Sequence, residues 1–237
     1  MAAPVNATAR ALKVVRYAAS TEVIRHALMS ARNPLLQEFL TSVAEAFSTV
    51  AIGPEAAGAI GRIHGALQAS GRAGTDTAER LQVCQHLDGA LATTRAASPS
   101  LARVADAFAA LEPLLRWTRR SASGPFASDN WPEGHANATM VGPGGLEHRE
   151  DLIIGVSLLA THVRYPDHNH SPEEVYLVLS PGRFQHGESD WFEPGIGGTL
   201  YNEPNIKHAM ASGDAPLLAL WYLWVGKPAS SQPTAPG

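Results

Sequence analysis

The 237-residue chain is predicted to be an α+β protein, with a helical first part packed on an antiparallel β sandwich or small barrel. Before about residue 121 the sequence is rich in Ala, and its apolar residues recur at helical spacing. After it come every Trp except Trp117, most of the Gly and Pro, and short β-type runs separated by turns. We therefore expect a helical region over residues 1–120 and a β domain over residues 121–228.

The helices are indicated by start signals followed by apolar stripes. Asn33-Pro34 reads as an N-cap followed by Pro at the first helical position, and Ser98-Pro99 repeats that signal. The first stripe comprises Leu36, Leu40, Val43, Phe47 and Val50, and the second comprises Leu101, Val104, Phe108, Leu111 and Leu115. A further helix is predicted over residues 81–91. We expect four or five helices packed on one another or on the β domain.

The β domain is predicted to start after an irregular connection over residues 121–150, which is rich in Ser, Gly, Pro and Asn. From residue 151 onward the strand-like runs are LIIGVSLLATHV, VYLVLS, GTLY and PLLALWYLWV. Ser180-Pro181-Gly182 and residues 212–214 are predicted turns. Residues 229–237 are predicted to be a disordered tail.

The composition of the chain argues against several classes of partner and indicates a location. The net charge of −4 and the lack of a concentrated basic face argue against a nucleic-acid partner. No apolar run approaches the ~20 residues that a membrane-spanning helix needs, so we expect no membrane partner. Cys84, the only cysteine, has no partner for an intrachain disulfide. A reducing compartment fits this best, and a cytoplasmic location is expected.

Three histidines and a carboxylate share a spacing that suits a metal site. His168 and His170 are two residues apart, so on a strand their side chains point to the same face. After a predicted turn, Glu174 and Tyr176 share a face by the same rule, and His208 must come from a distant strand. Three imidazoles and a carboxylate leave open positions on Fe(II), Mn(II), Ni(II) or Zn(II), whereas a structural zinc site would be closed and would usually recruit Cys. We therefore expect one divalent transition metal ion that binds a substrate.

The other histidines are interpreted as surface or core residues. They are His26, His64, His86, His135, His148, His162 and His186.

The metal pattern resembles the two cupin motifs. His168-x-His170-x3-Glu174, with Gly182 closing the strand turn, is similar to the first motif, and Pro204 to His208 is similar to the second. Asn205 stands where the second motif commonly has Gly, and this departure puts the local turn in question. The resemblance implies a double-stranded β-barrel and assigns His168, His170, Glu174 and His208 as the metal ligands.

Residues 165–176 and 191–195 further resemble the bacterial cupin-type dimethylsulfoniopropionate lyases, which cleave that sulfonium zwitterion to dimethyl sulfide and acrylate. The detailed resemblance covers roughly residues 160–225. It implies that Tyr176 is the base and that Tyr165 is a second important tyrosine. A nearby divalent cation favours tyrosinate, since the unperturbed pKa of tyrosine is ~10. The alternative for Tyr176 is an ordinary packed strand residue.

A sulfonium cation is held well by aromatic faces, worth ~0.5–2 kcal/mol each. The residues 121–237 offer Trp131, Tyr165, Phe184, Trp191, Tyr201, Trp221 and Tyr222. Our candidates for binding the substrate are Trp131, Trp191, Tyr201 and Trp221. Strand alternation predicts that Trp221 and Tyr222 point to opposite faces, so at most one of the two faces the interior.

Other readings remain open. The same ligands with Fe(II) suit a dioxygenase acting on a thiol or small acid, and a third alternative is a noncatalytic metal or ligand sensor.

Arg164 and Lys207 are candidates to contact a carboxylate, or are ordinary surface charges. The Arg116–Arg120 cluster is interpreted as a solvated helix end. The apolar helix faces are core, with a homodimer interface as an alternative.

Overall fold

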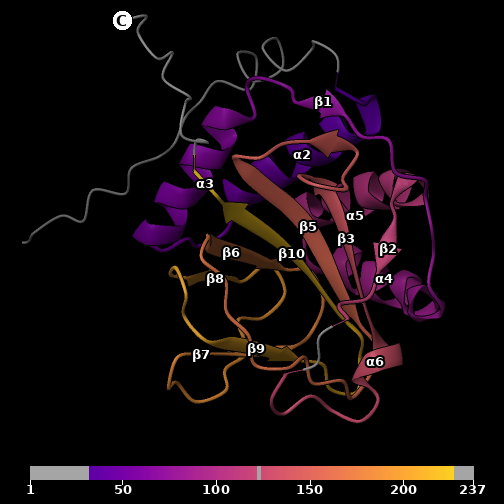
Figure 1. Ribbon diagram of the computed structural model, residues 1–237, viewed down its shortest axis with the longest axis vertical. Helices are drawn as coiled ribbons and strands as arrows, with labels where there is room; N and C mark the ends of the chain where they lie inside the picture. The colour runs from indigo at the N-terminus through magenta and orange to yellow at the C-terminus, as the bar shows by residue number, and fades with distance from the viewer. Residues whose placement is uncertain (1–31, 122–123, 227–237) are drawn as a thin grey trace, which may run out of the picture.

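The computed structural model describes residues 32–121 and 124–226, and within them a layer of helices covers one face of a large sheet (Figure 1). The predicted tail, residues 229–237, lies outside the described residues. The described helices are α2 (Pro34–Phe47), α3 (Pro54–Ala66), η1 (Gln82–His86), α4 (Leu87–Ala97), α5 (Pro99–Leu111), η2 (Glu112–Leu114) and α6 (Trp131–Gly134).

The strands form a large sheet in the order β1-β4-β3-β5-β10-β6-β8, with β2 also paired to β3, and a separate β7-β9 pair. The strands are β1 (Arg72–Ala73), β2 (Trp117–Thr118), β3 (His135–Val141), β4 (Glu147–His148), β5 (Leu152–Leu159), β6 (Glu173–Val178), β7 (Arg183–His186), β8 (Thr199–Asn202), β9 (His208–Ala211) and β10 (Leu217–Trp224). β1 and β2 lie in the region predicted to be helical and still join the large sheet. Strands of the large sheet therefore come from both parts of the sequence.

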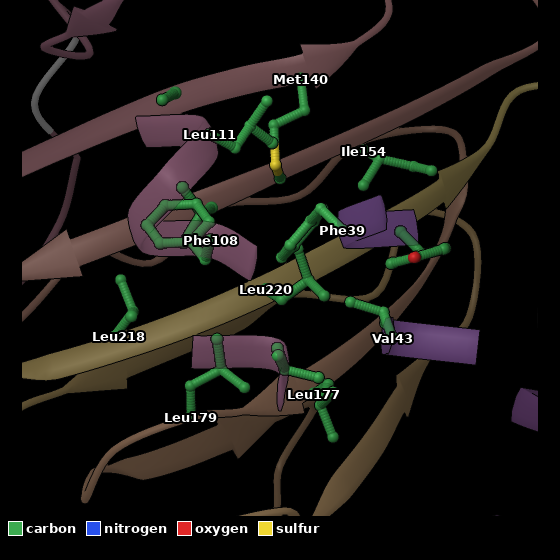
Figure 2. Packing of buried hydrophobic residues seen from close by; sticks show 14 of the residues in the cluster. Phe39, Val43, Phe108, Leu111, Met140, Ile154, Leu177, Leu179, Leu218 and Leu220 are labelled. Carbon is green, nitrogen blue, oxygen red and sulfur yellow. The ribbon is translucent and has the colours of Figure 1, made fainter. Parts of the chain in front are cut away.

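Each central strand of the large sheet has two buried faces, because neighbouring side chains point to opposite sides. One face packs against the helices, as Figure 2 shows for Leu177, Leu218 and Leu220 beside Phe39 and Phe108. The other face meets the β7-β9 pair around a second cluster. That cluster consists of Trp131, Leu159, Val163, Tyr165, Tyr176, Val178, Phe184, Leu200, Met210, Leu217 and Ala219. The α+β architecture predicted from the sequence is confirmed, with a cupin-type barrel interior on the side away from the helices.

The two predicted helix starts are confirmed. The Asn33 side chain accepts hydrogen bonds from the backbone N–H groups of Leu35 and Leu36, and Ser98 accepts one from Leu101. Val50 and Leu115, the last residues of the two stripes, lie beyond the helix ends but still pack on the core. The single helix predicted over residues 81–91 is divided in the structure. Residues 82–86 form the tighter 3₁₀ helix η1, and α4 begins at Leu87.

The prediction of an irregular connection over residues 121–150 was wrong. It contains α6, β4 and the central strand β3, which pairs along its length with β5. The sequence of β3, HANATMV, has few of the large β-branched or aromatic residues that mark strands, yet Ala136 and Ala138 are fully buried against the helices. Close packing of small side chains, set by tertiary contacts, outweighs the weak local preference. The short strand β7 also went unpredicted, whereas β9 is the distant strand that was expected to carry His208.

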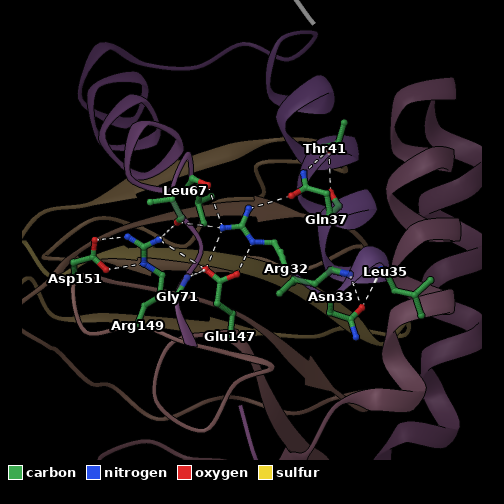
Figure 3. A network of polar contacts seen from close by, with 12 residues as sticks. Arg32, Asn33, Leu35, Gln37, Thr41, Leu67, Gly71, Glu147, Arg149 and Asp151 are labelled. Carbon is green, nitrogen blue, oxygen red and sulfur yellow. Dashed lines mark hydrogen bonds and ion pairs between the residues drawn. The ribbon is translucent and has the colours of Figure 1, made fainter. Parts of the chain in front are cut away.

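A buried ion pair ties the start of the helical layer to the edge of the sheet (Figure 3). The Arg32 guanidinium contacts the Glu147 carboxylate, and their side chains are only 1% and 4% exposed. Arg32 also donates to the carbonyl oxygens of Leu67 and Ala69, and Glu147 accepts from the backbone N–H of Gly71. This cluster, the Arg32–Glu147 cluster, therefore satisfies its charges from within the chain.

Candidate metal centre

The candidate ligands come from three separate segments that meet at one end of the barrel interior. Glu174 lies on β6, and His208 opens β9. His168 and His170 were expected on a strand, but their segment forms no continuous strand and has only isolated bridges at Arg164 and His168. His168 pairs with His208 through two backbone hydrogen bonds, of 3.0 and 2.9 Å, one donated by each residue to the other. Backbone pairing thus fixes the relative positions of the two sequence motifs.

Asn205 explains how the second motif departs from the usual pattern. Its backbone φ is +64°, in the left-handed region that favours Gly and that Asn tolerates better than most residues. Its N–H donates to the carbonyl oxygen of His170 at 2.8 Å. The turn that a Gly commonly supplies is therefore retained here by Asn.

Three of the four predicted ligands converge closely. Ligand atoms of His170, Glu174 and His208 all lie within 4.8 Å of one another. Glu174 Oε2 lies 3.4 Å from Nε2 of His170 and 3.3 Å from Nε2 of His208. His168 lies beside this group, with its ring centroid 4.1 Å from that of His208 and 6.3 Å from that of His170. We call these four residues the His–Glu cluster.

All three imidazoles are oriented in the same way. Nδ1 lies 2.9 Å from the Pro166 carbonyl oxygen in His168, 2.9 Å from that of Pro172 in His170, and 3.0 Å from that of Ile206 in His208. A carbonyl oxygen can only accept, so each Nδ1 carries the proton and donates it. Each neutral ring therefore keeps its lone pair on Nε2, as is usual for metal-bound histidine held by a backbone carbonyl.

Burial and charge set the protonation of the cluster. Burial, followed by the charge of His208, lowers the pKa of His168 to about 3. Burial also lowers the pKa of His208, against the opposing effect of Glu174. For Glu174, burial works to raise the pKa, but the hydrogen bond from His170 and the charge of His208 outweigh it, and the pKa is lowered. Burial works to lower the pKa of His170, but the hydrogen bond to Glu174 and the charge of Glu174 outweigh it, and the pKa is raised. At neutral pH His168 and His208 thus offer neutral imidazoles and Glu174 a carboxylate, whereas His170 has to release the proton that it shares with Glu174 before it binds a metal ion.

The donor atoms fit a divalent transition metal ion. His208 Nε2 is buried and has no hydrogen-bond partner among the described residues. It faces the Glu174 oxygen, and two lone-pair atoms at 3.3 Å repel unless a proton or a cation lies between them. Imidazole and carboxylate donors suit Fe, Mn, Ni or Zn.

The predicted tyrosines both lie in the barrel interior, beside the His–Glu cluster. Tyr176 follows Glu174 by two residues on β6 and is 4% exposed. Burial raises its pKa well above the ordinary value, and the adjacent Glu174 charge adds to the rise. The Tyr165 ring centroid lies 5.1 Å from that of His168, and the Tyr165 oxygen accepts a hydrogen bond from Asn137 Nδ2 at 3.2 Å.

Two of the four aromatic candidates for substrate binding lie at the barrel interior. Trp131 is buried in the interior cluster, and Trp221 packs against it. The Trp221 indole lies over Gly155, where any side chain would clash with it, and its Nε1–H donates to Ser157. Tyr222 points to the helices, so the predicted opposition of Trp221 and Tyr222 is confirmed.

The other two candidates lie elsewhere. Tyr201 packs on the helical side of the sheet, and its hydroxyl donates to Glu173, so the structure does not bring it to the interior. Its register partner on β6 is Val175, which faces the helices, and strand alternation therefore turns Tyr201 away from Glu174. The Trp191 ring is in contact with two cations, with Arg164 Cζ 5.4 Å and Arg183 Cζ 5.1 Å from its centroid.

Sequence reasoning missed several residues beside the site. Asn202, paired with Glu174 across β6 and β8, donates from Nδ2 to Glu174 Oε2 at 3.0 Å. Its polar side chain at a buried strand position was the available signal. His135, interpreted as a surface or core residue, stacks on Trp131 with ring centroids 4.1 Å apart. No local signal marked it, because β3 itself went unpredicted.

A helical layer on a two-sheet barrel defines the class of the protein as a cupin-type fold, and the histidines and carboxylate that converge inside it form a candidate metal site. Residues 56–219 match the model of the family described as "Dimethlysulfonioproprionate lyase". The chain belongs to this family of dimethylsulfoniopropionate lyases.

Curated relatives agree with the family assignment. The chain is 29% identical over 92 residues to the putative dimethylsulfoniopropionate lyase DddL of Cereibacter sphaeroides, covering 39% of each chain. It is 26% identical over 132 residues to the dimethylsulfoniopropionate lyase DddQ of Ruegeria pomeroyi, covering 53% of this chain and 62% of that one. The matched region thus spans less than two thirds of either relative.

Solved structures share the fold. A crystal structure reported under "DMSP lyases RdDddP and RnDddQII" superposes with a TM-score of 0.60 at 21% identity, covering 86% of this chain and 98% of that one. The DddQ lyase from Ruegeria pomeroyi gives a TM-score of 0.58 at 18% identity, with 85% and 95% covered. Within residues 32–121 and 124–226, no helix has both the length and the apolar character needed to cross a bilayer.

Proposed function

We propose that the protein is a metal-dependent lyase that cleaves dimethylsulfoniopropionate to dimethyl sulfide and acrylate by base-catalysed β-elimination. The observation that carries the proposal is the position of Tyr176, buried beside Glu174 on the strand that faces the His–Glu cluster. Membership of the lyase family supplies the substrate class.

His168, His170, Glu174 and His208 would hold one divalent transition metal ion, either Fe, Mn, Ni or Zn. When bound, the ion would supply positive charge that stabilises the substrate carboxylate and favours the ionised form of Tyr176. Burial and Glu174 both oppose that ionisation, so Tyr176 depends on a nearby cation to act as a base near neutral pH.

The elimination needs one base and no further reactant. The Tyr176 oxygen takes the proton from the carbon next to the carboxylate, and that C–H electron pair forms the new double bond. The neighbouring carbon–sulfur bond breaks, and its electrons go to the sulfonium sulfur, so dimethyl sulfide leaves as a neutral molecule. The leaving group needs no acid. Tyr165 would position the substrate from the wall beside His168.

Trp131 and Trp221 would contact the sulfonium end, because aromatic faces attract soft organic cations. Both lie at the barrel interior, whereas the Trp191 ring is already in contact with Arg164 and Arg183. The proposed substrate site therefore runs from the His–Glu cluster to the Trp131 and Trp221 rings.

The test is headspace gas chromatography of protein loaded with each of the four metals. Dimethyl sulfide is expected with at least one metal, and Tyr176→Phe is expected to lose activity by about 100-fold or more, as for a general base. Tyr201→Phe is the matched control, since its hydroxyl bonds Glu173 on the helical side and activity should be retained. Absence of product with every metal would reject the function. Full activity in Tyr176→Phe would reject only the base.

Oxygen consumption separates this function from that of a dioxygenase, because the elimination uses no O2. An oxygen electrode trace should stay flat during turnover with Fe(II).

A further inference from the structure

A series of hydrogen bonds links side chains of three neighbouring strands on the wall of the barrel interior. Asn137 lies on β3 between two alanines that pack on the helices, so its own side chain faces the interior. Ser157 on β5 is its register partner, and Trp221 on β10 lies opposite Gly155, two residues before Ser157. The series runs from Trp221 through Ser157 and Asn137 to Tyr165, and we call these four residues the Asn137 network.

The backbone of Asn137 is held from both sides. The Arg116–Arg120 cluster was expected to be a solvated helix end, but Trp117 and Thr118 form β2 instead, and Thr118 pairs with Asn137. Ser157 pairs with Asn137 from the other side, on β5. The Asn137 amide therefore projects into the barrel from a central strand.

The direction of each hydrogen bond in the network follows from its donors. Trp221 Nε1 can only donate, and Ser157 Oγ accepts from it at 3.1 Å. The Ser157 hydroxyl has one proton of its own, which it donates to the Asn137 amide oxygen at 2.7 Å. Asn137 therefore presents its amide nitrogen to Tyr165, whose oxygen accepts at 3.2 Å. The reversed amide would leave the proton of Ser157, a residue only 3% exposed, without an acceptor among the described residues.

The Tyr165 ring is fixed by its surroundings. The Tyr165 backbone N–H donates to the Met210 carbonyl oxygen at 2.8 Å, and the His135 ring meets the Tyr165 ring edge-on at 5.5 Å. His135 is held in turn, because its Nδ1 lies 2.6 Å from the Trp131 carbonyl oxygen and its Nε2 accepts the Arg120 backbone N–H at 3.0 Å. With the ring fixed, the remaining freedom of Tyr165 is rotation of its O–H bond.

The Asn137 network leaves the Tyr165 hydroxyl as a donor. Its oxygen already accepts from Asn137, and its own proton has no acceptor among residues 32–121 and 124–226. Tyr165 is 4% exposed, and its ring lies beside that of His168 in the His–Glu cluster. Because buried polar groups are normally hydrogen-bonded, this proton is available to an acceptor on a ligand in the barrel.

We propose that Asn137 and Ser157 are positioning residues that hold the Tyr165 hydroxyl as a hydrogen-bond donor to the carboxylate of the substrate. The identity of that ligand rests on the proposed function. In dimethylsulfoniopropionate the carboxylate is the hydrogen-bond acceptor, since the sulfonium sulfur is cationic, and a charged acceptor strengthens the bond. The same network holds the indole of Trp221, which is proposed to contact the sulfonium end, so it would act on both ends of the substrate.

The test is a double-mutant cycle on binding of acrylate, measured by calorimetry on protein loaded with Zn(II) and checked for metal content. Tyr165→Phe should bind acrylate about 10- to 100-fold more weakly, the range for losing a hydrogen bond to a charged group. Asn137→Leu frees the hydroxyl to rotate and should cost about 3- to 10-fold, the range for one neutral hydrogen bond. Added to Tyr165→Phe, Asn137→Leu should cause no further loss, because the hydroxyl that it positions is gone.

The control for Asn137→Leu is Thr139→Val, which changes a polar residue of the same strand outside the Asn137 network and should bind acrylate like the wild type. Losses from Asn137→Leu and Tyr165→Phe that simply add would overturn the inference, since a purely structural effect of Asn137 does not depend on Tyr165. Wild-type affinity in Asn137→Leu would also overturn it.

Ser157 provides a second test, which decides the question should Asn137→Leu not fold. Ser157→Ala removes the proton that orients the Asn137 amide and should weaken acrylate binding by about 3- to 10-fold, whereas Ser157→Thr keeps the hydroxyl and should restore it. Equal affinities in these two variants would contradict the inference, as would a wild type that does not bind acrylate. A wild type that shows the expected coupling but releases no dimethyl sulfide would reject only the proposed reaction.

Discussion

The molecule buries two polar clusters, and they differ in whether the chain itself completes them. In the Arg32–Glu147 cluster, the guanidinium and the carboxylate satisfy each other, and backbone groups provide further hydrogen bonds (Figure 3). In the His–Glu cluster, His208 Nε2 is also buried but has no hydrogen-bond partner within the described residues, and it lies 3.3 Å from the Glu174 oxygen. The first cluster stabilises the fold, and the second has the donor atoms of a candidate metal site.

The largest effect should come from breaking the complete cluster. Arg32→Met leaves the Glu147 carboxylate buried without its main partner, and removal of one member of a buried pair costs ~3–5 kcal/mol. Urea unfolding of the metal-free protein measures the loss. Arg95→Met, which breaks an exposed pair with Asp106, should cost below ~1 kcal/mol. Equal losses in the two variants would show that the Arg32–Glu147 cluster is not essential for the fold.

The incomplete cluster should respond to metal instead. Zn(II) at about 100 times its dissociation constant should stabilise the wild type by ~2.7 kcal/mol, and a chelator should reverse this. His208→Asn should lose the effect, because it removes a proposed metal ligand. His162→Asn, which changes an exposed histidine, should retain it. The readout is the midpoint of thermal unfolding with and without metal, and an equal shift in both variants would place the metal elsewhere.

Asn202 tests how far the cluster depends on its neighbours. Asn202→Ala removes the hydrogen bond to Glu174 Oε2 and is expected to weaken metal binding about 10- to 100-fold, as is typical for residues that orient metal ligands. Competition with a fluorescent chelator measures the dissociation constant. Asn130→Ala, at an exposed position, is the control. A wild-type constant in Asn202→Ala would mean that β6 alone fixes Glu174.

The smallest effect concerns another buried atom without a hydrogen-bond partner, in the helical layer. His64 Nε2 is buried beside the rings of Phe47 and Tyr222, and burial lowers the pKa of His64 to about 4. Between pH 6.5 and 4 the unfolded chain binds a proton that the folded chain does not, so this residue makes stability fall as the pH falls. Above pH 6.5 it contributes nothing.

His64→Leu should therefore reduce the loss of stability between pH 7 and pH 5 relative to the wild type. Urea unfolding at both pH values, on metal-free protein, provides the measurement. A loss that is unchanged in His64→Leu would assign the acid sensitivity to other groups.

Local signals allowed much of this architecture to be predicted. The caps at Asn33 and Ser98 depend only on a side chain and the next few residues, so sequence predicted where α2 and α5 begin. The strand carrying Glu174 and Tyr176 followed from the two-residue period. The sequence failed at β3, where small residues form a central strand through contacts with distant segments.

By itself the sequence determined which residue types are present for a metal site and which of them share a strand face, because side-chain chemistry and strand period are local properties. Only the tertiary structure decided that Asn202 contacts Glu174, that Tyr201 faces the helices, and that Arg120 adjoins His135. Those contacts join residues far apart in the chain, and they depend on strand order and register, which local sequence does not encode.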